Sequence, residues 1–142
     1  MAGNLTDAGE NLALDLLFRN AATPPTDIYL GLATAAVGDA DDLSTITEED
    51  DGSYSRQAVT FTTPADNGSG ATETTNDAAI EFGPWGADAD NAITYAFLTD
   101  AQTGNTTSDG DILAWFELPQ SKTPASGETL TVPINELVFD ID

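Results

Sequence analysis

Carboxylates are the groups in this sequence best suited to chemistry. The 142 residues contain 25 Asp and Glu against Arg19, Arg56 and Lys122, a formal net charge of −22, and they contain no His and no Cys. These absences exclude histidine acid–base catalysis, thiol nucleophiles, disulfides and the usual zinc and iron–sulfur sites. A pair of carboxylates such as Glu81 and Glu117, both in predicted strands, remains as a candidate for glycoside cleavage.

Chance is a simpler explanation of that pair, because 25 acidic residues in a short chain produce many pairs. A sugar-cleaving groove also needs several aromatic side chains, whereas Trp85 and Trp115 are readily explained as core residues. The sequence therefore favours a protein that is not an enzyme and that has no catalytic residue.

Residues 37–53 hold seven acids with little periodicity, which predicts an exposed acidic loop. Calcium needs about six to eight oxygen ligands, and neither this stretch nor residues 88–91 has the central Gly and terminal Glu of an EF-hand. Residues 68–70 are not followed by the Lys of a phosphate-binding loop. We expect a solvated loop without a bound metal or cofactor. The alternative is a specific cation site.

The charge also restricts the partners. A surface this negative repels nucleic acid and anionic lipid, and no apolar run has the length of about 18 residues that a membrane span requires. The N-terminus also lacks the pattern of a secretory signal.

The composition of the charged residues bears on the solvent. Of the acids 17 are Asp, and one Lys is present. Because the Debye length falls from about 8 Å in physiological saline to about 3 Å in 1 M salt, this composition predicts adaptation to molar salt. A calcium-loaded or simply acidic mesophilic protein is the alternative.

One helix is predicted, over residues 5–19. Leu5, Ala8, Leu12, Leu16 and Leu17 recur at steps of three and four on one face, with Asn4 or Thr6 as N-cap. Pro24 and Pro25 forbid continuation, so the helix should end near Asn20. We expect Leu12, Leu16 and Leu17 either to pack in the core of the chain or to form an interface with a neighbour.

Period-two alternation and turn residues predict short strands after the helix, with residues 63–76 as a linker. The predicted strands span residues 27–33, 53–62, 78–82, 93–99, 112–118, 130–132 and 137–141. No long helical segment separates them, so the expected fold is all-β: one domain over residues 1–142, an antiparallel, jelly-roll-like β-sandwich with a short N-terminal helix. Arg56, in a predicted strand, should pair with a carboxylate or carbonyls, as a local bridge or as a contact between subunits.

The order of several short motifs resembles a family of small virion proteins of tailed viruses, described as capsid cement or as tail-fibre-like proteins. The motifs cover nearly the whole chain: Ile28-Tyr29-Leu30-Gly31-Leu32, residues 52–61, residues 76–82, Trp85-Gly86, residues 97–101, Thr103-Gly104, Leu113-Ala114-Trp115-Phe116, Leu118, Ser121-Lys122-Thr123, Gly127-Glu128-Thr129-Leu130 and the closing apolar strand. The resemblance implies a jelly-roll-like sandwich on the outer shell and supplies no catalytic residues. Acidity and the expanded loop at residues 39–51 depart from the family pattern, which implies a virus of a salt-loving host, an archaeon.

The resulting hypothesis is a capsid decoration protein of a halophilic tailed virus. It would sit on the outer capsid surface, bind the major capsid protein and form a dimer or trimer, because capsid positions have two- or threefold symmetry. Its candidate interface residues are Leu12, Leu16, Leu17 and Arg56. The alternative is a tail or head-fibre component that contacts the host surface.

Overall fold

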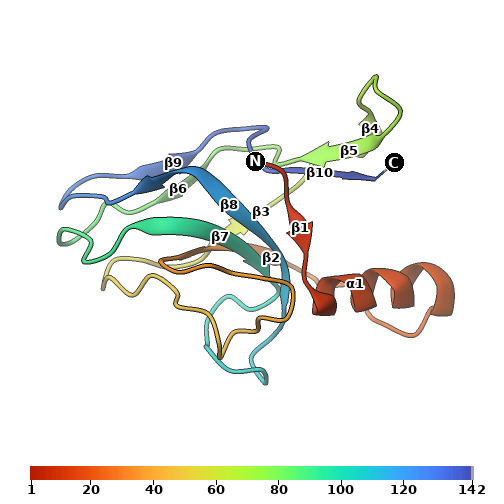
Figure 1. The fold of residues 1–142 in the computed structure, drawn as a ribbon, viewed down its shortest axis with the longest axis horizontal. Helices are drawn as coiled ribbons and strands as arrows, with labels where there is room; N and C mark the ends of the chain where they lie inside the picture. Colours follow the sequence, from red (N-terminus) through yellow and green to blue (C-terminus); the bar gives the residue numbers. More distant parts are fainter. Residues whose placement is uncertain (142) are drawn as a thin grey trace.

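The computed structural model describes residues 1–141 as two helical segments and a set of short strands (Figure 1). The helical segments are α1 (Asp7–Leu14) and the π-helical turn η1 (Asp15–Arg19), which continues it. The strands are β1 (Asn4–Leu5), β2 (Ile28–Ala33), β3 (Gln57–Val59), β4 (Ala65–Asp66), β5 (Thr72–Thr75), β6 (Ile80–Phe82), β7 (Ile93–Thr99), β8 (Ile112–Lys122), β9 (Leu130–Val132) and β10 (Val138–Ile141).

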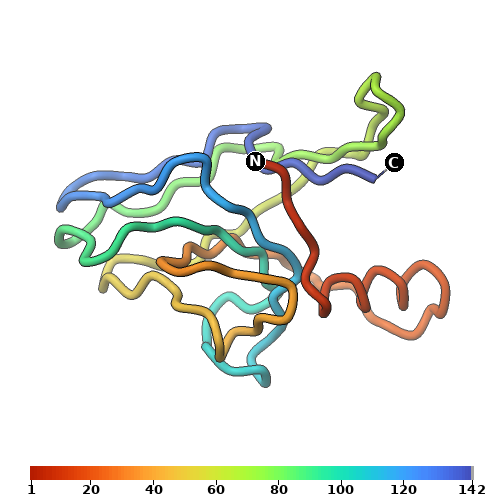
Figure 2. Tube along the Cα trace, viewed as in Figure 1, coloured from red at the N-terminus to blue at the C-terminus, as the bar shows by residue number. Residues whose placement is uncertain are grey.

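The strands form an antiparallel sandwich, as the sequence predicts. One layer is a five-stranded sheet in the order β1-β8-β7-β2-β3. The other layer is built from the pair β6-β9 and the three-stranded sheet β10-β5-β4, which extend one another across the top of Figure 2. All pairs between named strands are antiparallel. The helical segments leave the body at one end, near the edge formed by β1 and β8.

The main core lies between the two layers. Alternation along β2 directs Leu30 and Leu32 into it, and they meet Ile80 and Phe82 of β6 from the opposite layer. Trp85, which follows β6, is also buried there. Burial of apolar side chains from both layers is the main force that holds the sandwich closed.

A second core covers the outer face of the five-stranded sheet. Phe97 of β7 packs there against Val37 and Leu43 from the acidic segment 37–53. The expectation that this segment is an exposed loop is therefore wrong in part, because two apolar side chains anchor it to the sheet. Of its carboxylates Asp39 and Asp50 are exposed, Glu49 is buried and the others are half-buried. Gly31 lies directly beneath the Phe97 ring, since a Cβ atom there would come within 2.2 Å of the ring.

Three other boundaries differ from the predictions. The expected linker 63–76 contains the hairpin β4-β5, β3 is confined to three residues of the predicted strand 53–62, and β8 runs four residues beyond its predicted end. Leu5 belongs to β1 rather than to the helix, because its backbone pairs with Ala114 before Thr6 caps α1. The helical segment ends as expected, with Asn20 in the left-handed conformation at φ 50°. Within residues 1–141, no helix is long and apolar enough to cross a membrane.

Candidate interaction surface

Residues 7–19, named the arm here, are fixed to the body through their first turn. The buried hydroxyl of Thr6 accepts a hydrogen bond from the Gly9 N–H at 3.1 Å and donates to the Ile112 carbonyl, while the Thr6 N–H donates to the Leu113 carbonyl at 3.1 Å. Gly9 permits the close approach, because a Cβ atom there would lie 1.9 Å from the Leu113 oxygen. The base of the arm is therefore held by a side-chain cap and by backbone contact with β8.

The far half of the arm carries large apolar side chains in solvent. Leu14 is 55% exposed, Leu17 73% and Phe18 80%. These three residues, named the outer stripe, are spaced i, i+3 and i+4 and so share one face of the helix. Arg19 beside them forms an ion pair with Asp15 at 2.8 Å, and Glu10 precedes Leu14 by one helical turn.

The opposite face of the arm forms one wall of an apolar groove of about 420 Å³. Leu12 and Leu16 are half-buried in this wall, and the other walls come from β1, β2, β8, β10 and the stretch before β4, including Phe61, Pro64 and Phe139. In Figure 2 the arm projects from one end of the molecule, on the same side as the β4-β5 hairpin. Within the part of the chain that the structure describes, no residue lining the groove carries an ionisable side chain, although the chain has 25 acids.

The structure divides the predicted interface leucines. Leu12 and Leu16 lie in the groove wall and Leu17 lies in the outer stripe, and none of the three belongs to either buried core. Sequence reasoning did not single out Leu14 and Phe18. The sequence does contain the pattern that identifies them, because Leu14, Leu17 and Phe18 recur at steps of three and four on a second face of the helix.

Arg56 is an internal bridge. Its Nε and Nη2 atoms donate to the two carboxylate oxygens of Glu48 at 2.8 and 2.7 Å, and it also donates to the carbonyls of Ala101 and Gly104 at 2.9 and 2.7 Å. Its guanidinium lies 5.5 Å from the centre of the Phe97 ring. The side chain is 4% exposed, which matches the local-bridge alternative and leaves little of it available to a neighbouring subunit.

Tyr54 completes this buried cluster. Its hydroxyl donates to Glu48 at 2.8 Å and accepts from the Leu32 N–H at 2.8 Å. Burial of the phenol, reinforced by the Glu48 charge, raises the pKa of Tyr54 well above its ordinary value. The cluster thus connects the acidic segment 37–53 to β2, so its role is structural.

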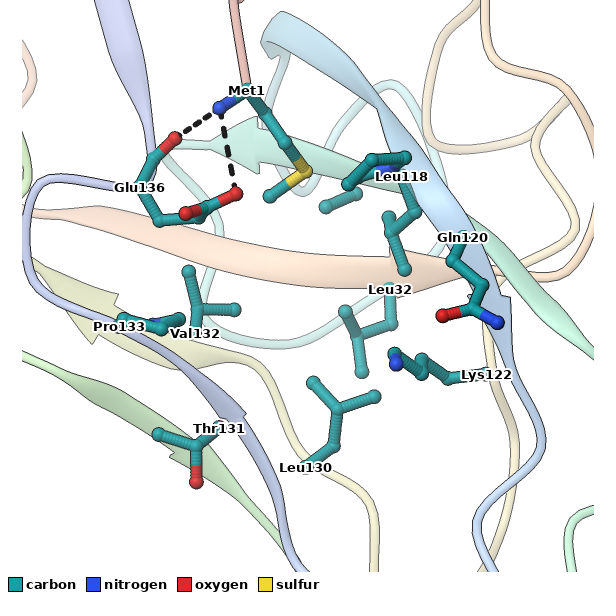
Figure 3. Close-up of a pocket in the computed structure, with 12 residues that line it drawn as sticks. Met1, Leu32, Leu118, Gln120, Lys122, Leu130, Thr131, Val132, Pro133 and Glu136 are labelled. Atoms are coloured by element: carbon teal, nitrogen blue, oxygen red, sulfur yellow. Dashed lines mark hydrogen bonds and ion pairs between the residues drawn. The ribbon is translucent and has the colours of Figure 1, made fainter.

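A second cavity, of about 470 Å³, opens between β8 and β9, which are not hydrogen-bonded to each other (Figure 3). Leu32, Leu118 and Leu130 project into it, and the Met1 amino group closes one end by contacting the Glu136 backbone carbonyl and, at 3.6 Å, its carboxylate. Among its described lining residues Glu136 is the one carboxylate. The cavity is a gap between the layers with polar residues at its rim.

The predicted carboxylate pair is not brought together in one site. Glu81 lies on β6 opposite Thr131, whereas Glu117 lies on β8 opposite Tyr95 in the other layer, and both side chains are exposed. Of the acids in residues 1–141, no three converge in a way that could hold a metal ion. Three loop carboxylates instead serve local turns: hydrogen bonds from Ser44, Ser53 and Thr106 lower the pKa of Asp42, Asp51 and Asp109 respectively.

The fold and its surfaces define a small antiparallel β-sandwich whose apolar arm and groove are exposed on a strongly acidic body. The family model described as podophage GP4 fiber I protein gp80 matches residues 4–140, so the chain belongs to that family. It is therefore a structural protein of the virion of a tailed virus, as the motif order indicated. No curated protein matches the chain.

Proposed function

We propose that this chain decorates and stabilises the capsid of a tailed virus by binding neighbouring capsid subunits, chiefly the major capsid protein. The observation that carries the proposal is the exposed apolar stripe on the arm, Leu14, Leu17 and Phe18, in a chain with a net charge of −22. A charged surface keeps the body apart from most other molecules, whereas exposed apolar side chains are typical of sites that other proteins cover. Function then resides in contact between proteins, without a catalysed reaction.

Decoration stabilises a capsid by linkage. A protein that binds the assembled shell and not its separated subunits favours the assembled state in proportion to its binding free energy. A small module with a projecting attachment element suits this role, because it can occupy each equivalent shell position without a long shaft. We place the protein on the outer capsid surface.

A tail or head-fibre component that contacts the host surface is the second candidate, and the fibre description of the family favours it. Against it, the chain has no repeats and no sustained heptads, the sequence patterns expected of a fibre shaft.

Copy number separates the two candidates. Quantitative mass spectrometry of purified virions, referenced to the major capsid protein, should give hundreds of copies per particle for a decoration protein. A value of about three to a few dozen would support a fibre or tail part and overturn decoration, because such parts follow the low symmetry of the tail and its attachment points. A density map of the whole particle would locate the protein in either case.

We further propose that the virus infects a halophilic, archaeal host. Support comes from the excess of 25 acids over three cations and from the exposed position of most of these acids. Carboxylates at this density repel one another, and molar salt screens that repulsion. The melting temperature of the purified chain should rise steeply with KCl concentration. A melting temperature that hardly changes between about 0.15 M and 1 M KCl would contradict the halophilic origin.

A further inference from the structure

The cavity of about 470 Å³ between β8 and β9 has an apolar interior. Leu32 and Ala96 line it from the inner face of the five-stranded sheet, and the half-buried Leu118 and Leu130 line it from β8 and β9. Its volume lies within the range of pockets that hold small organic ligands, which are mostly apolar with a few polar groups. Size and lining therefore suit a molecule with an apolar body.

Lys122 places a positive charge in this cavity. Its backbone lies opposite Ile93 of β7, and its ammonium is turned toward Leu32 and Leu130 (Figure 3). The two arginines and the N-terminal amino group each form an ion pair, whereas no carboxylate of the described residues pairs with Lys122. In a chain with 25 acids, this ammonium thus faces an apolar space instead of a carboxylate.

The two acids that line this region have other partners. Glu136 lies at the opposite end of the cavity, where its carboxylate meets the Met1 amino group at 3.6 Å (Figure 3). Glu128 lines an adjoining pocket that Lys122 also lines, and its carboxylate accepts a hydrogen bond from the Ala125 N–H at 2.8 Å. The Lys122 end of the cavity is therefore able to receive an anionic group.

The strand edges beside the cavity do not favour a peptide as its occupant. An added strand binds through hydrogen bonds to the N–H and C=O groups that an edge strand presents. Pro119 lies within β8 and Pro133 directly follows β9; both line the cavity, and neither has an N–H to donate. Each edge lacks a donor at this point, which favours an occupant held by apolar contact and by one charge.

We propose that this cavity binds a small amphipathic carboxylate. Its apolar tail lies among Leu32, Leu118 and Leu130, and its carboxylate accepts a charge-assisted hydrogen bond from the Lys122 ammonium. The cavity shares no lining residue with the groove beside the arm, so this binding is a function additional to the proposed attachment to the capsid.

Decanoate is the probe, titrated calorimetrically into the full chain. Molar KCl is kept constant, because it screens repulsion between the anion and the carboxylates of the protein. Decanol carries the same tail without the charge, and acetate carries the charge without the tail. We expect decanoate to bind at one site per chain and acetate to show no measurable binding.

Lys122→Gln removes the cation at an exposed position and should leave the fold intact. The matched control is Arg19→Gln, which removes one positive charge from the arm, outside the cavity. We expect Lys122→Gln to weaken decanoate binding about tenfold and to leave decanol binding unchanged, since the lost interaction is a charge-assisted hydrogen bond. Arg19→Gln should bind both ligands as the unmodified chain does.

Two outcomes would overturn the proposal. If the unmodified chain does not bind decanoate, the cavity is not a site for this class of ligand. If Lys122→Gln and Arg19→Gln bind decanoate equally well, the ligand binds elsewhere, and the groove beside the arm is then the apolar surface to examine. Circular dichroism verifies that each variant is folded.

The melting temperature supplies an independent measurement, because a ligand that binds the folded chain stabilises it. Decanoate should raise the melting temperature of the unmodified chain and of Arg19→Gln, and it should raise that of Lys122→Gln less. An equal rise in all three would contradict the role of Lys122. These measurements use the purified chain, so their result does not depend on the copy number or the position in the virion that test the proposed function.

Discussion

Replacement of Gly9 by Ala tests how the arm is seated on the sheet. On an exposed helix the change should stabilise the protein by about 1 kcal/mol, because Ala has the higher helix propensity. Here the new Cβ atom would lie 1.9 Å from the Leu113 oxygen, whereas ordinary contact begins at 3.4 Å. That oxygen belongs to the backbone of β8, which is held by pairing with β7 and β1. The arm therefore has to move.

The cost follows from the contacts that the movement breaks. Thr6 would lose its capping interaction with Gly9, worth about 1 kcal/mol, and its two hydrogen bonds to Ile112 and Leu113, worth about 1 kcal/mol each. A loss of about 3 kcal/mol against a gain of about 1 kcal/mol leaves a destabilisation of about 2 kcal/mol. For a chain of this size the melting temperature should fall by about 6 °C.

Urea unfolding at fixed KCl, followed by circular dichroism, measures the difference in the free energy of unfolding, and urea avoids changing the ionic strength. The matched control is Asn11→Ala, an exposed position on the same helix, which should be stabilised by a few tenths of a kcal/mol. If Gly9→Ala equals or exceeds the unmodified protein in stability, the arm does not rest on β8 as described and the reasoning fails.

Three further changes test the buried contacts. Arg56→Met should cost roughly 3 kcal/mol in urea unfolding because the half-buried Glu48 loses its partner. Adding Glu48→Met should recover part of that loss, and strictly additive effects would contradict the coupling. Gly31→Ala should cost about 2 kcal/mol by forcing a Cβ atom into the Phe97 ring, and Phe97→Leu should relieve it; an unchanged melting temperature would refute the contact. Because the pKa of Tyr54 is raised in the folded state, its contribution to stability is complete below pH about 10, the pKa of the unfolded phenol, and declines as the pH rises above it. Tyrosinate absorbance should show this phenol ionising together with alkaline unfolding, a step absent from Tyr54→Phe; ionisation before unfolding would be the contrary result.

The sandwich was predictable because large apolar residues occupy alternate positions along strands such as β2. The alternation of Leu30 and Leu32 with smaller residues is visible in the sequence, and the same alternation places them in the core. The hairpin β4-β5 escapes a search for apolar alternation because β4 has two residues and all four residues of β5 are polar. Gly68 and Gly70, at φ 80° and 99°, form its turn, and glycines in a Thr- and Asn-rich stretch are equally typical of a linker.

The anchoring of residues 37–53 could not be obtained from periodicity. Val37 and Leu43 are isolated apolar residues in an acidic stretch, and their burial depends on the position of Phe97 in a strand far along the chain. Arg56 was informative for a simpler reason: in a chain with three cations, a cation within a predicted strand has many carboxylates available, and Glu48 proved to be its partner.

The groove was beyond sequence analysis because its walls come from the arm, the stretch before β4 and β10, which lie far apart in the chain and meet only in the fold. The position of these walls also shows where the acidic residues of the sequence lie relative to the groove. The described residues that line the groove carry no charge, while carboxylates occupy much of the remaining surface. Screening by salt weakens repulsion between bodies but leaves apolar contact intact. An attachment through apolar surfaces such as the groove should therefore gain stability as salt rises, which is the reverse of an attachment through exposed ion pairs.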